Sequence, residues 1–153
     1  MIVISDTSSI TSLISIGYID ILRKMYKEVL IPNAVNIELK KEHVDLPGFI
    51  KLEYVKDKKT IELLLNEIDI GEAESIVLAK EKKADLLLID DHFGRIVAER
   101  EGVKIIGLLG VLLIAKNERY IDSIKKIILL LEEKAGFWIS AGLKEYILKK
   151  AGE

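Results

Sequence analysis

Acidic side chains follow several apolar segments of this chain, at positions where they could bind a divalent cation. Asp6 follows the first apolar segment and Glu38 lies on the segment after the first proline. Glu72 follows a glycine, and Asp90 and Asp91 close a continuous apolar run. The carboxyl ends of parallel strands meet at one edge of a sheet, where ligands bind in open α/β folds. The sequence therefore predicts an acidic pocket at that edge, most simply a site for a divalent cation.

Each of these acids alone has an ordinary structural explanation. Asp6 could cap the helix that follows it, and Glu38 could be a surface glutamate. Glu72 lies in a first helical turn, which favours anions, and Asp90 and Asp91 could be turn residues. Two unit charges 4 Å apart, however, repel by about 4 kcal/mol at an effective dielectric constant of 20. Three or four ionised carboxylates in one pocket would therefore destabilise the fold unless a cation neutralised them.

The absence of cysteine restricts the kind of metal. A chain without cysteine has no thiolate zinc site and no cysteine nucleophile, so any metal must be held by oxygen or by His43 and His92. Each histidine stands alone in a polar stretch, and an all-oxygen site suits Mg²⁺ or Mn²⁺, so we expect neither to be a ligand. Such a cation could activate a water and stabilise charge on a phosphate, which is the chemistry of metal-assisted phosphodiester cleavage.

The elements that must position these acids alternate between strand and helix. Short apolar runs predict buried parallel strands, and apolar residues at helical spacing predict the helices between them. The expected strands are residues 2–5, 29–31, 86–89 and 103–106, with 50–55 a strand or an extended edge segment. The expected helices are residues 10–16, 19–26, 32–42, 60–68, 71–83 and 95–101. We therefore expect an α/β fold in which right-handed helical crossovers join parallel strands.

The C-terminal third is predicted to be helical. From residue 108 onward the pattern is helical, in pieces separated by residues 117–120 and by Gly136. No repeat or linker divides the chain, so we expect one domain over residues 1–153, with 119–153 a helical C-terminal extension. Helical apolar stripes usually face a core, so we expect this extension to cover the core rather than to form a dimer surface. The stripe consists of Ile127, Ile128, Leu130, Leu131, Trp138, Ile139, Tyr146 and Ile147.

Composition limits the class of protein. The chain has 153 residues, of which half are apolar and 31% are charged, as in a globular domain. Its apolar runs are far shorter than the roughly 18 residues that span a membrane, so we expect no membrane partner and a cytoplasmic location. The formal net charge of −2 gives no overall basic field, so a nucleic-acid partner cannot be argued from net charge.

Four motifs in this order resemble a known family. The chain opens with Ile-Val-Ile-Ser-Asp6-Thr-Ser8-Ser-Ile, and Glu38 lies on the segment after Ile-Pro. Gly-Glu72-Ala-Glu-Ser-Ile-Val-Leu-Ala and Leu-Ile-Asp90-Asp-His-Phe-Gly-Arg follow. Over roughly residues 1–115 the motifs are similar in order and spacing to the PIN domain family. They resemble in particular an uncharacterised prokaryotic branch close to the toxin ribonucleases of VapBC-type toxin–antitoxin pairs.

This resemblance implies a fold, an activity and a set of site residues. The fold would be a three-layer α/β/α sandwich around a parallel sheet, and the activity a Mg²⁺- or Mn²⁺-dependent endoribonuclease. Ser8 would support the first aspartate. The catalytic acids would be Asp6, Glu38, Glu72 and Asp90. The metal ligands would be Asp6, Glu72, Asp90 and Asp91.

Two of these assignments are choices between near neighbours. Glu72 is preferred over Glu74 because it lies 18 residues before Asp90, a spacing that the related toxins share. Asp90 is preferred over Asp91 because Phe93 then falls three residues later, as in the family. Glu74 and Asp91 remain the alternatives.

The leading functional hypothesis is a ribonuclease that acts on RNA, as the toxin of a toxin–antitoxin pair, with an antitoxin partner and a homodimeric state. The alternative is a catalytically weak or inactive module that binds RNA or protein, because Ile89 stands where many members have threonine and Glu72 where aspartate is commoner. A receiver or phosphatase domain would need a second acid near Asp6, and Ser5 and Thr7 flank that residue instead. Arg95 could contact phosphate or pair with Asp91.

Overall fold

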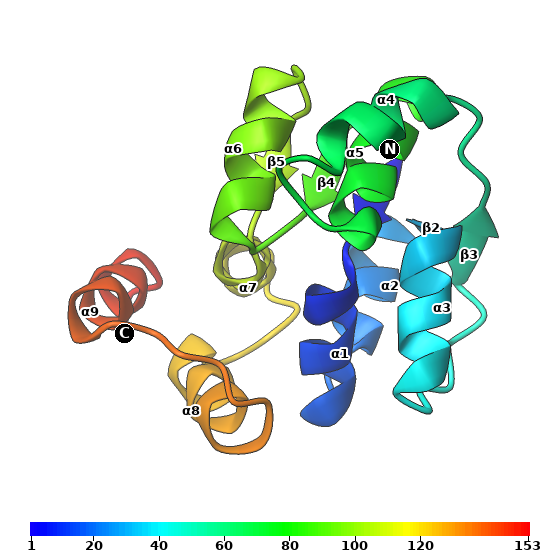
Figure 1. Ribbon diagram of the computed structural model, residues 1–153. Coiled ribbons are helices and arrows are strands. Elements are labelled where there is room, and N and C mark those ends of the chain that lie inside the picture. The colour runs from blue at the N-terminus through cyan, green and yellow to red at the C-terminus, as the bar shows by residue number, and fades with distance from the viewer.

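Five parallel strands form the central sheet of the protein, which a computed structural model describes over residues 1–153 (Figure 1). The strand order is β3-β2-β1-β4-β5, and every neighbouring pair is parallel. The strands are β1 (Val3–Ser5), β2 (Val29–Pro32), β3 (Ile50–Glu53), β4 (Leu86–Leu88) and β5 (Ile105–Ile106). The predicted α/β fold with a parallel sheet is confirmed.

Helices cover both faces of this sheet and make the three layers. On one face lie α4 (Lys58–Leu64), α5 (Ile70–Lys82) and α6 (His92–Arg100), which share one hydrophobic core. The other core contains residues of α1 (Thr7–Ser15), α2 (Asp20–Tyr26), α3 (Asn33–Lys41), α7 (Leu108–Asn117), α8 (Ile124–Lys134) and α9 (Ala141–Lys150). Helix α3 packs against both α1 and α5, so it contacts helices of both groups (Figure 1).

The inner strands β1, β2 and β4 are mostly buried on both faces, which explains their largely apolar sequences, whereas the edge strand β3 carries the exposed Lys51 and Leu52. Successive side chains of a strand point to opposite faces of the sheet. Val3 and Leu88 accordingly join the core on the α1 side, while Ile4 and Leu87 join the core on the α5 side. Each such side chain contributes about 1.5–3 kcal/mol to stability when fully buried. Because β1 is the central strand, the residue that follows it reaches the middle of the sheet edge.

Several element boundaries differ from the prediction. Helix α6 begins at His92 rather than at residue 95, because the Asp91 side chain accepts a hydrogen bond from the backbone of Gly94 and caps the helix there. Helix α4 ends at Leu64, short of residue 68. Strand β5 has only two residues, although Lys104 also pairs with β4 through its carbonyl oxygen.

The C-terminal helices differ in how deeply they are buried. Helix α8 buries its apolar face, as predicted, through Ile124, Ile127, Ile128 and Leu131. Helix α9, by contrast, buries only Ile147, and the predicted stripe is wrong at Trp138 and Tyr146, which are exposed. Trp138 lies in the loop between the two helices, where the helical spacing assumed for the stripe does not apply.

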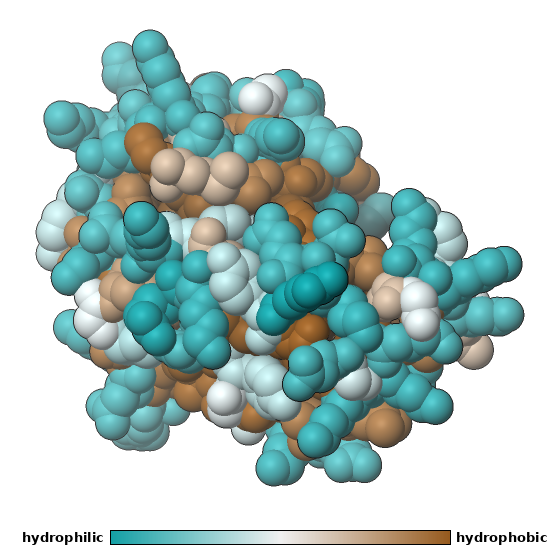
Figure 2. Space-filling model, turned by 180° about the vertical axis from the view of Figure 1, so that it is seen from behind, coloured by the Kyte–Doolittle hydropathy of each residue, from teal (hydrophilic) through white to brown (hydrophobic).

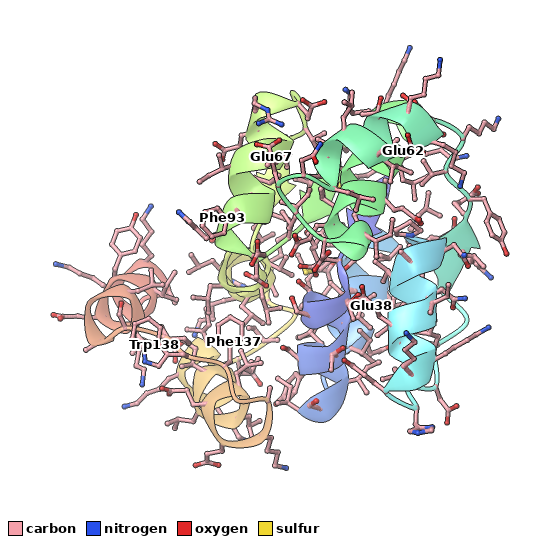
Figure 3. The ribbon with its side chains drawn as sticks, viewed as in Figure 1. Glu38, Glu62, Glu67, Phe93, Phe137 and Trp138 are labelled. Atoms are coloured by element: carbon pink, nitrogen blue, oxygen red, sulfur yellow. The ribbon has the colours of Figure 1, made fainter.

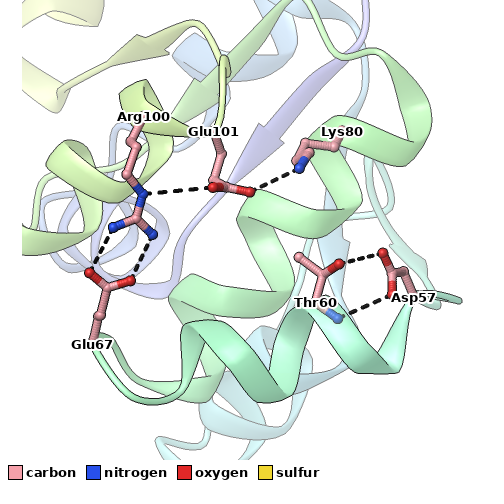
Figure 4. Close-up of polar contacts among 6 residues, drawn as sticks. All are labelled: Asp57, Thr60, Glu67, Lys80, Arg100 and Glu101. Carbon is pink, nitrogen blue, oxygen red and sulfur yellow. Dashed lines mark hydrogen bonds and ion pairs between the residues drawn. The ribbon is translucent and has the colours of Figure 1, made fainter.

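Surface ion pairs link the end of α6 to α5 and to the loop before it, and a helix cap lies nearby on α4 (Figure 4). Lys80 of α5 lies 2.9 Å from Glu101, and Arg100 at the end of α6 lies 2.7 Å from Glu67 in the loop before α5. Asp57 caps α4 by accepting from Thr60. Exposed pairs of this kind contribute about 0–1 kcal/mol each, so burial in the core dominates the docking of these helices.

Hydrophilic side chains cover most of the face seen from behind, with apolar residues showing between them (Figure 2). None of the helices combines the length and the apolar character that crossing a membrane requires.

Candidate functional site

An acidic cavity of about 380 Å³ opens where α1, α3, α5 and the start of α6 meet. Six carboxylates line it, and no lysine, arginine or histidine does. The lining residues are Asp6, Thr7, Ser8, Thr11, Ser12, Glu38, Glu42, Asp69, Gly71, Glu72, Asp91 and Ala135. The predicted Asp6, Glu38 and Glu72 thus share one pocket, although they are far apart in sequence.

Asp6 is the most deeply buried of these acids, with 5% of its surface exposed. It follows β1 and caps α1, since one carboxylate oxygen accepts from the Ser9 backbone N–H at 3.1 Å. Its other oxygen accepts from the Asp90 backbone N–H at 3.2 Å. Burial raises the pKa of Asp6 to about 6, and the charge of Asp90 adds to this, against hydrogen bonds from Ser9 that lower it. Asp6 is therefore both a helix cap and a wall of the cavity.

Three successive hydroxyls at the start of α1 each hold a different carboxylate. The Thr7 hydroxyl donates to Glu38, the Ser8 hydroxyl to Asp6 at 3.2 Å, and the Ser9 hydroxyl to Asp90 at 3.2 Å. Successive side chains of a helix point about 100° apart, so three neighbours can serve three directions. The polar start of α1 thereby orients acids that come from α3, β1 and the end of β4.

Glu38 reaches the cavity from α3, between α1 and α5 (Figure 3). A Cβ atom at Gly71 would lie 2.7 Å from one carboxylate oxygen of Glu38, a distance that excludes any larger residue without a shift. The glycine before Glu72 thus lets α5 approach Glu38 closely.

Glu72 and Glu74 lie on different sides of α5. Glu72 lines the cavity, and its pKa is raised to about 7, first by burial and then by the charges of Asp69, Asp91 and Asp6. Glu74 instead accepts a hydrogen bond at 3.0 Å from the backbone N–H of Ala34. It caps α3, whose own N-cap residue is a proline without a side-chain acceptor.

Asp90 and Asp91 also have separate surroundings. The carboxylate of Asp90 accepts from the Leu108 backbone N–H at 3.0 Å and from the Ser9 hydroxyl, so it ties β4 to the first turns of α1 and α7. Burial raises the pKa of Asp90. The carboxylate of Asp91 accepts from the Gly94 N–H at 2.9 Å and lines the cavity, which Asp90 does not.

Neither histidine lies in the cavity, and Arg95 does not line it either. Arg95 is turned toward Asp90, since a Cβ atom at Gly107 would lie 2.7 Å from its guanidinium and 2.9 Å from the Asp90 carboxylate. The cavity wall is therefore built of carboxylate and hydroxyl oxygens.

Residues 2–153 match the PIN domain family. The chain belongs to the PIN domain family. PIN domains are generally nucleases that use divalent metals. A comparison with curated proteins found no match. The family match continues through α8 and α9 of this PIN domain.

The chemical type of the side chains in the cavity of this PIN domain suits a hard cation, because every polar side chain there presents oxygen as a possible ligand atom. The raised pKa values of Asp6 and Glu72 report carboxylates that are buried near other negative charges, which a cation would relieve. No three acidic or histidine side chains, however, stand close enough together to hold a metal ion in this arrangement.

Two acids of the cavity were not predicted from the sequence. Glu42 lies four residues after Glu38, on the same face of α3, and accepts from the Thr11 hydroxyl at 3.1 Å. Asp69 caps α5 through the backbone N–H of Glu72 at 2.9 Å. The helical spacing of Glu42 and the position of Asp69 before a helix were the available signals.

Proposed function

We propose that this PIN domain is a Mg²⁺- or Mn²⁺-dependent endoribonuclease that cleaves RNA in the acidic cavity. The observation that carries the proposal is the gathering of Asp6, Glu38, Glu72 and Asp91 around one cavity that no basic side chain lines. Mutual repulsion among carboxylates destabilises a fold, and a bound cation relieves it. Membership of a family of nucleases supports the same function.

Asp6, Asp91 and Glu72 would hold the cation, with Asp91 rather than Asp90 as the ligand from the end of β4. Glu72 would turn toward Asp6 and Asp91 to complete this set, because no three acids converge on one point in the structure, whereas Glu38 would keep its hydrogen bond from the Thr7 hydroxyl. When bound, the cation supplies positive charge at the scissile phosphate and lowers the pKa of a water.

The remaining steps belong to side chains of the protein. Glu38, oriented by the Thr7 hydroxyl, would position the attacking water and accept its proton. Ser8 would hold the rotamer of Asp6. Asp90 would act as a positioning residue, because its carboxylate does not line the cavity and instead accepts hydrogen bonds from Ser9 and Leu108.

Substitution of the cavity acids tests the proposal. Asp6→Asn and Asp91→Asn should each lower Mn²⁺-stimulated cleavage of single-stranded RNA by at least 100-fold, because one metal ligand is lost while asparagine retains the helix cap. The control is Glu62→Gln, on the exposed surface of α4. Cleavage by purified Asp6→Asn protein at the rate of the Glu62→Gln control would show that the proposal is wrong.

The alternative function is a catalytically weak or inactive module that binds RNA or protein. The specific observation in its favour is that no three acids stand at metal-binding distance. Calorimetry with Mn²⁺ separates the two functions, since the nuclease binds the cation and loses this binding in Asp6→Asn. A protein that releases no heat with Mn²⁺ and still binds RNA would favour the module.

The more specific role that we propose is the toxin of a toxin–antitoxin pair, with an antitoxin as protein partner and a homodimer as the assembly. The sequence motifs shared with the prokaryotic toxin branch support this role. An adjacent reading frame that encodes a short protein with a DNA-binding N-terminus, and that relieves growth arrest on coexpression, is the expected result. Light scattering of the purified protein gives the oligomeric state.

A further inference from the structure

Gly71 leaves the space that the carboxylate of Glu38 occupies. A Cβ atom at Gly71 would lie 2.7 Å from one carboxylate oxygen of Glu38, 3.3 Å from the carboxylate carbon and 3.4 Å from the other oxygen. Real Cβ atoms essentially never approach another atom within 3.0 Å. Any larger residue at this position and Glu38 in its observed position therefore exclude each other.

The hydroxyl of Thr7 engages the same carboxylate from α1. Glu38 extends from α3 toward α1 (Figure 3), and the Thr7 hydroxyl donates to the carboxylate oxygen that lies farther from Gly71. The nearer oxygen packs against the backbone of α5. We call this position of the carboxylate, between Thr7 and Gly71, the Glu38 slot. It is built by α1 and α5, and only a residue without a side chain at position 71 leaves it open.

The backbone of α5 does not itself require glycine at this position. Gly71 is the second residue of the helix, and its φ is not positive. Glycine is less favourable than alanine in a helix, because it loses more backbone freedom on folding. Gly71 is also buried, so a methyl group there would lie away from water. Helix stability alone therefore favours alanine, and the Glu38 carboxylate is what glycine accommodates.

We propose that Gly71 is a positioning residue, which keeps the Glu38 slot open at a cost in the stability of α5. The proposal rests on the proposed function, in which Glu38 positions the attacking water. The atoms that a methyl group at residue 71 would meet all belong to the end of a flexible side chain and not to backbone. Glu38 is only half-buried, so it would swing out of the slot and away from the Thr7 hydroxyl while the helices stay in place.

Gly71→Ala and Gly142→Ala form a matched pair of variants. Gly142 is likewise the second residue of a helix, α9, and a Cβ atom there would meet nothing within 4 Å. In EDTA both variants should unfold at a Tm equal to or above that of the unaltered protein, because both gain helix propensity. Only Gly71→Ala should lower kcat of Mn²⁺-stimulated RNA cleavage, by roughly 10-fold or more and with KM unchanged, because a displaced Glu38 no longer orients the water.

Thr7→Val reports the position of Glu38 without any cleavage. The substitution removes the hydroxyl that donates to Glu38, so it should lower Tm in the unaltered protein and by the same amount in Gly142→Ala. In Gly71→Ala that hydrogen bond is already broken, so Thr7→Val should lower Tm by less. An equal loss of Tm in all three backgrounds would overturn the proposal. So would a Tm of Gly71→Ala well below that of the unaltered protein, since the helices rather than Glu38 would then have moved.

The outcomes also separate this proposal from the nuclease. A smaller effect of Thr7→Val in Gly71→Ala, in a protein that shows no metal-stimulated cleavage, would support the slot and contradict the nuclease. Cleavage that Asp6→Asn abolishes, with equal kcat for Gly71→Ala and Gly142→Ala and an equal effect of Thr7→Val on Tm in both, would support the nuclease and overturn the slot.

Discussion

At the scale of single residues, the main feature is that the same carboxylates serve the fold and the cavity. Asp6, Asp69 and Asp91 each cap a helix with one oxygen while the cavity has access to the side chain. Helix caps contribute about 0.5–2 kcal/mol, which offsets part of the repulsion among the acids. The caps also fix each carboxylate at the start of a helix, so the acids are held in place before any cation arrives.

The raised pKa values predict how stability depends on pH. Asp6 has its pKa raised to about 6 and Glu72 to about 7, so between their unfolded values near 4 and pH 7 the folded state binds more protons than the unfolded state. Stability from these groups is therefore highest below pH 4 and is lost as pH rises toward 7. Full ionisation of Asp6 alone costs roughly 3 kcal/mol.

Thermal unfolding in EDTA at several pH values measures this effect. The difference in Tm between Asp6→Asn and the unaltered protein should grow from pH 5 to pH 8 in favour of the variant. Mn²⁺ at pH 8 should reverse the difference, because it stabilises only the protein that retains its ligand. A difference in Tm that stays constant with pH would contradict the assigned environment of Asp6.

At the scale of elements, the cavity depends on the docking of α3 against α5. Glu74 supplies the cap that Pro32 cannot provide to α3, and it comes from the same helix as Glu72. Gly71 permits the close approach that brings Glu38 beside Glu72. Of the two candidate glutamates of α5, Glu74 therefore positions α3, and Glu72 lines the cavity.

Glu74→Ala should consequently act on catalysis through Glu38. Loss of the cap should lower stability by about 0.5–2 kcal/mol and allow Glu38 to move, so kcat should fall several-fold while KM stays unchanged. Glu74→Gln retains an acceptor oxygen and should restore most of kcat. Chemical denaturation and steady-state kinetics measure both effects, and a kcat equally low in Glu74→Gln would contradict the capping role.

Most of these helices and strands could be predicted from the sequence. Which of two neighbouring acids faces the cavity could not. Strands and helices have periodic patterns, so β1, β4, α3 and α5 were located closely. Glu72 and Glu74 lie about 200° apart around the helix, and only the position of α3 shows which one it engages. Asp90 and Asp91 point apart after β4, and Asp90 is turned by the start of α7, which lies 18 residues later in the chain. Long-range contacts of this kind leave no local pattern.

At the scale of the whole molecule, the C-terminal segment fastens the helical layer that supports the cavity. The Glu153 carboxylate accepts hydrogen bonds from the backbone of Ile124 at 2.7 Å and Lys125 at 3.3 Å, and from the Ser123 hydroxyl at 2.9 Å. Lys116 of α7 lies 3.1 Å away. One side chain thus joins the end of α9 to the start of α8 and to α7. Helix α8 in turn leads to Ala135 of the cavity wall.

Glu153→Gln should therefore loosen the whole C-terminal layer. Burial alone would raise the pKa of Glu153, but the hydrogen bonds from Ile124, Ser123 and Lys116 outweigh it and hold the pKa at about 2. This stability is present above the unfolded pKa near 4.5 and is lost as pH falls toward 2. The variant should lose about 1–2 kcal/mol at pH 7, or roughly 2–8 °C in Tm, and little at pH 2. Glu133→Gln, on the exposed face of α8, is the control, and equal Tm values for the two variants at pH 7 would contradict the fastening role.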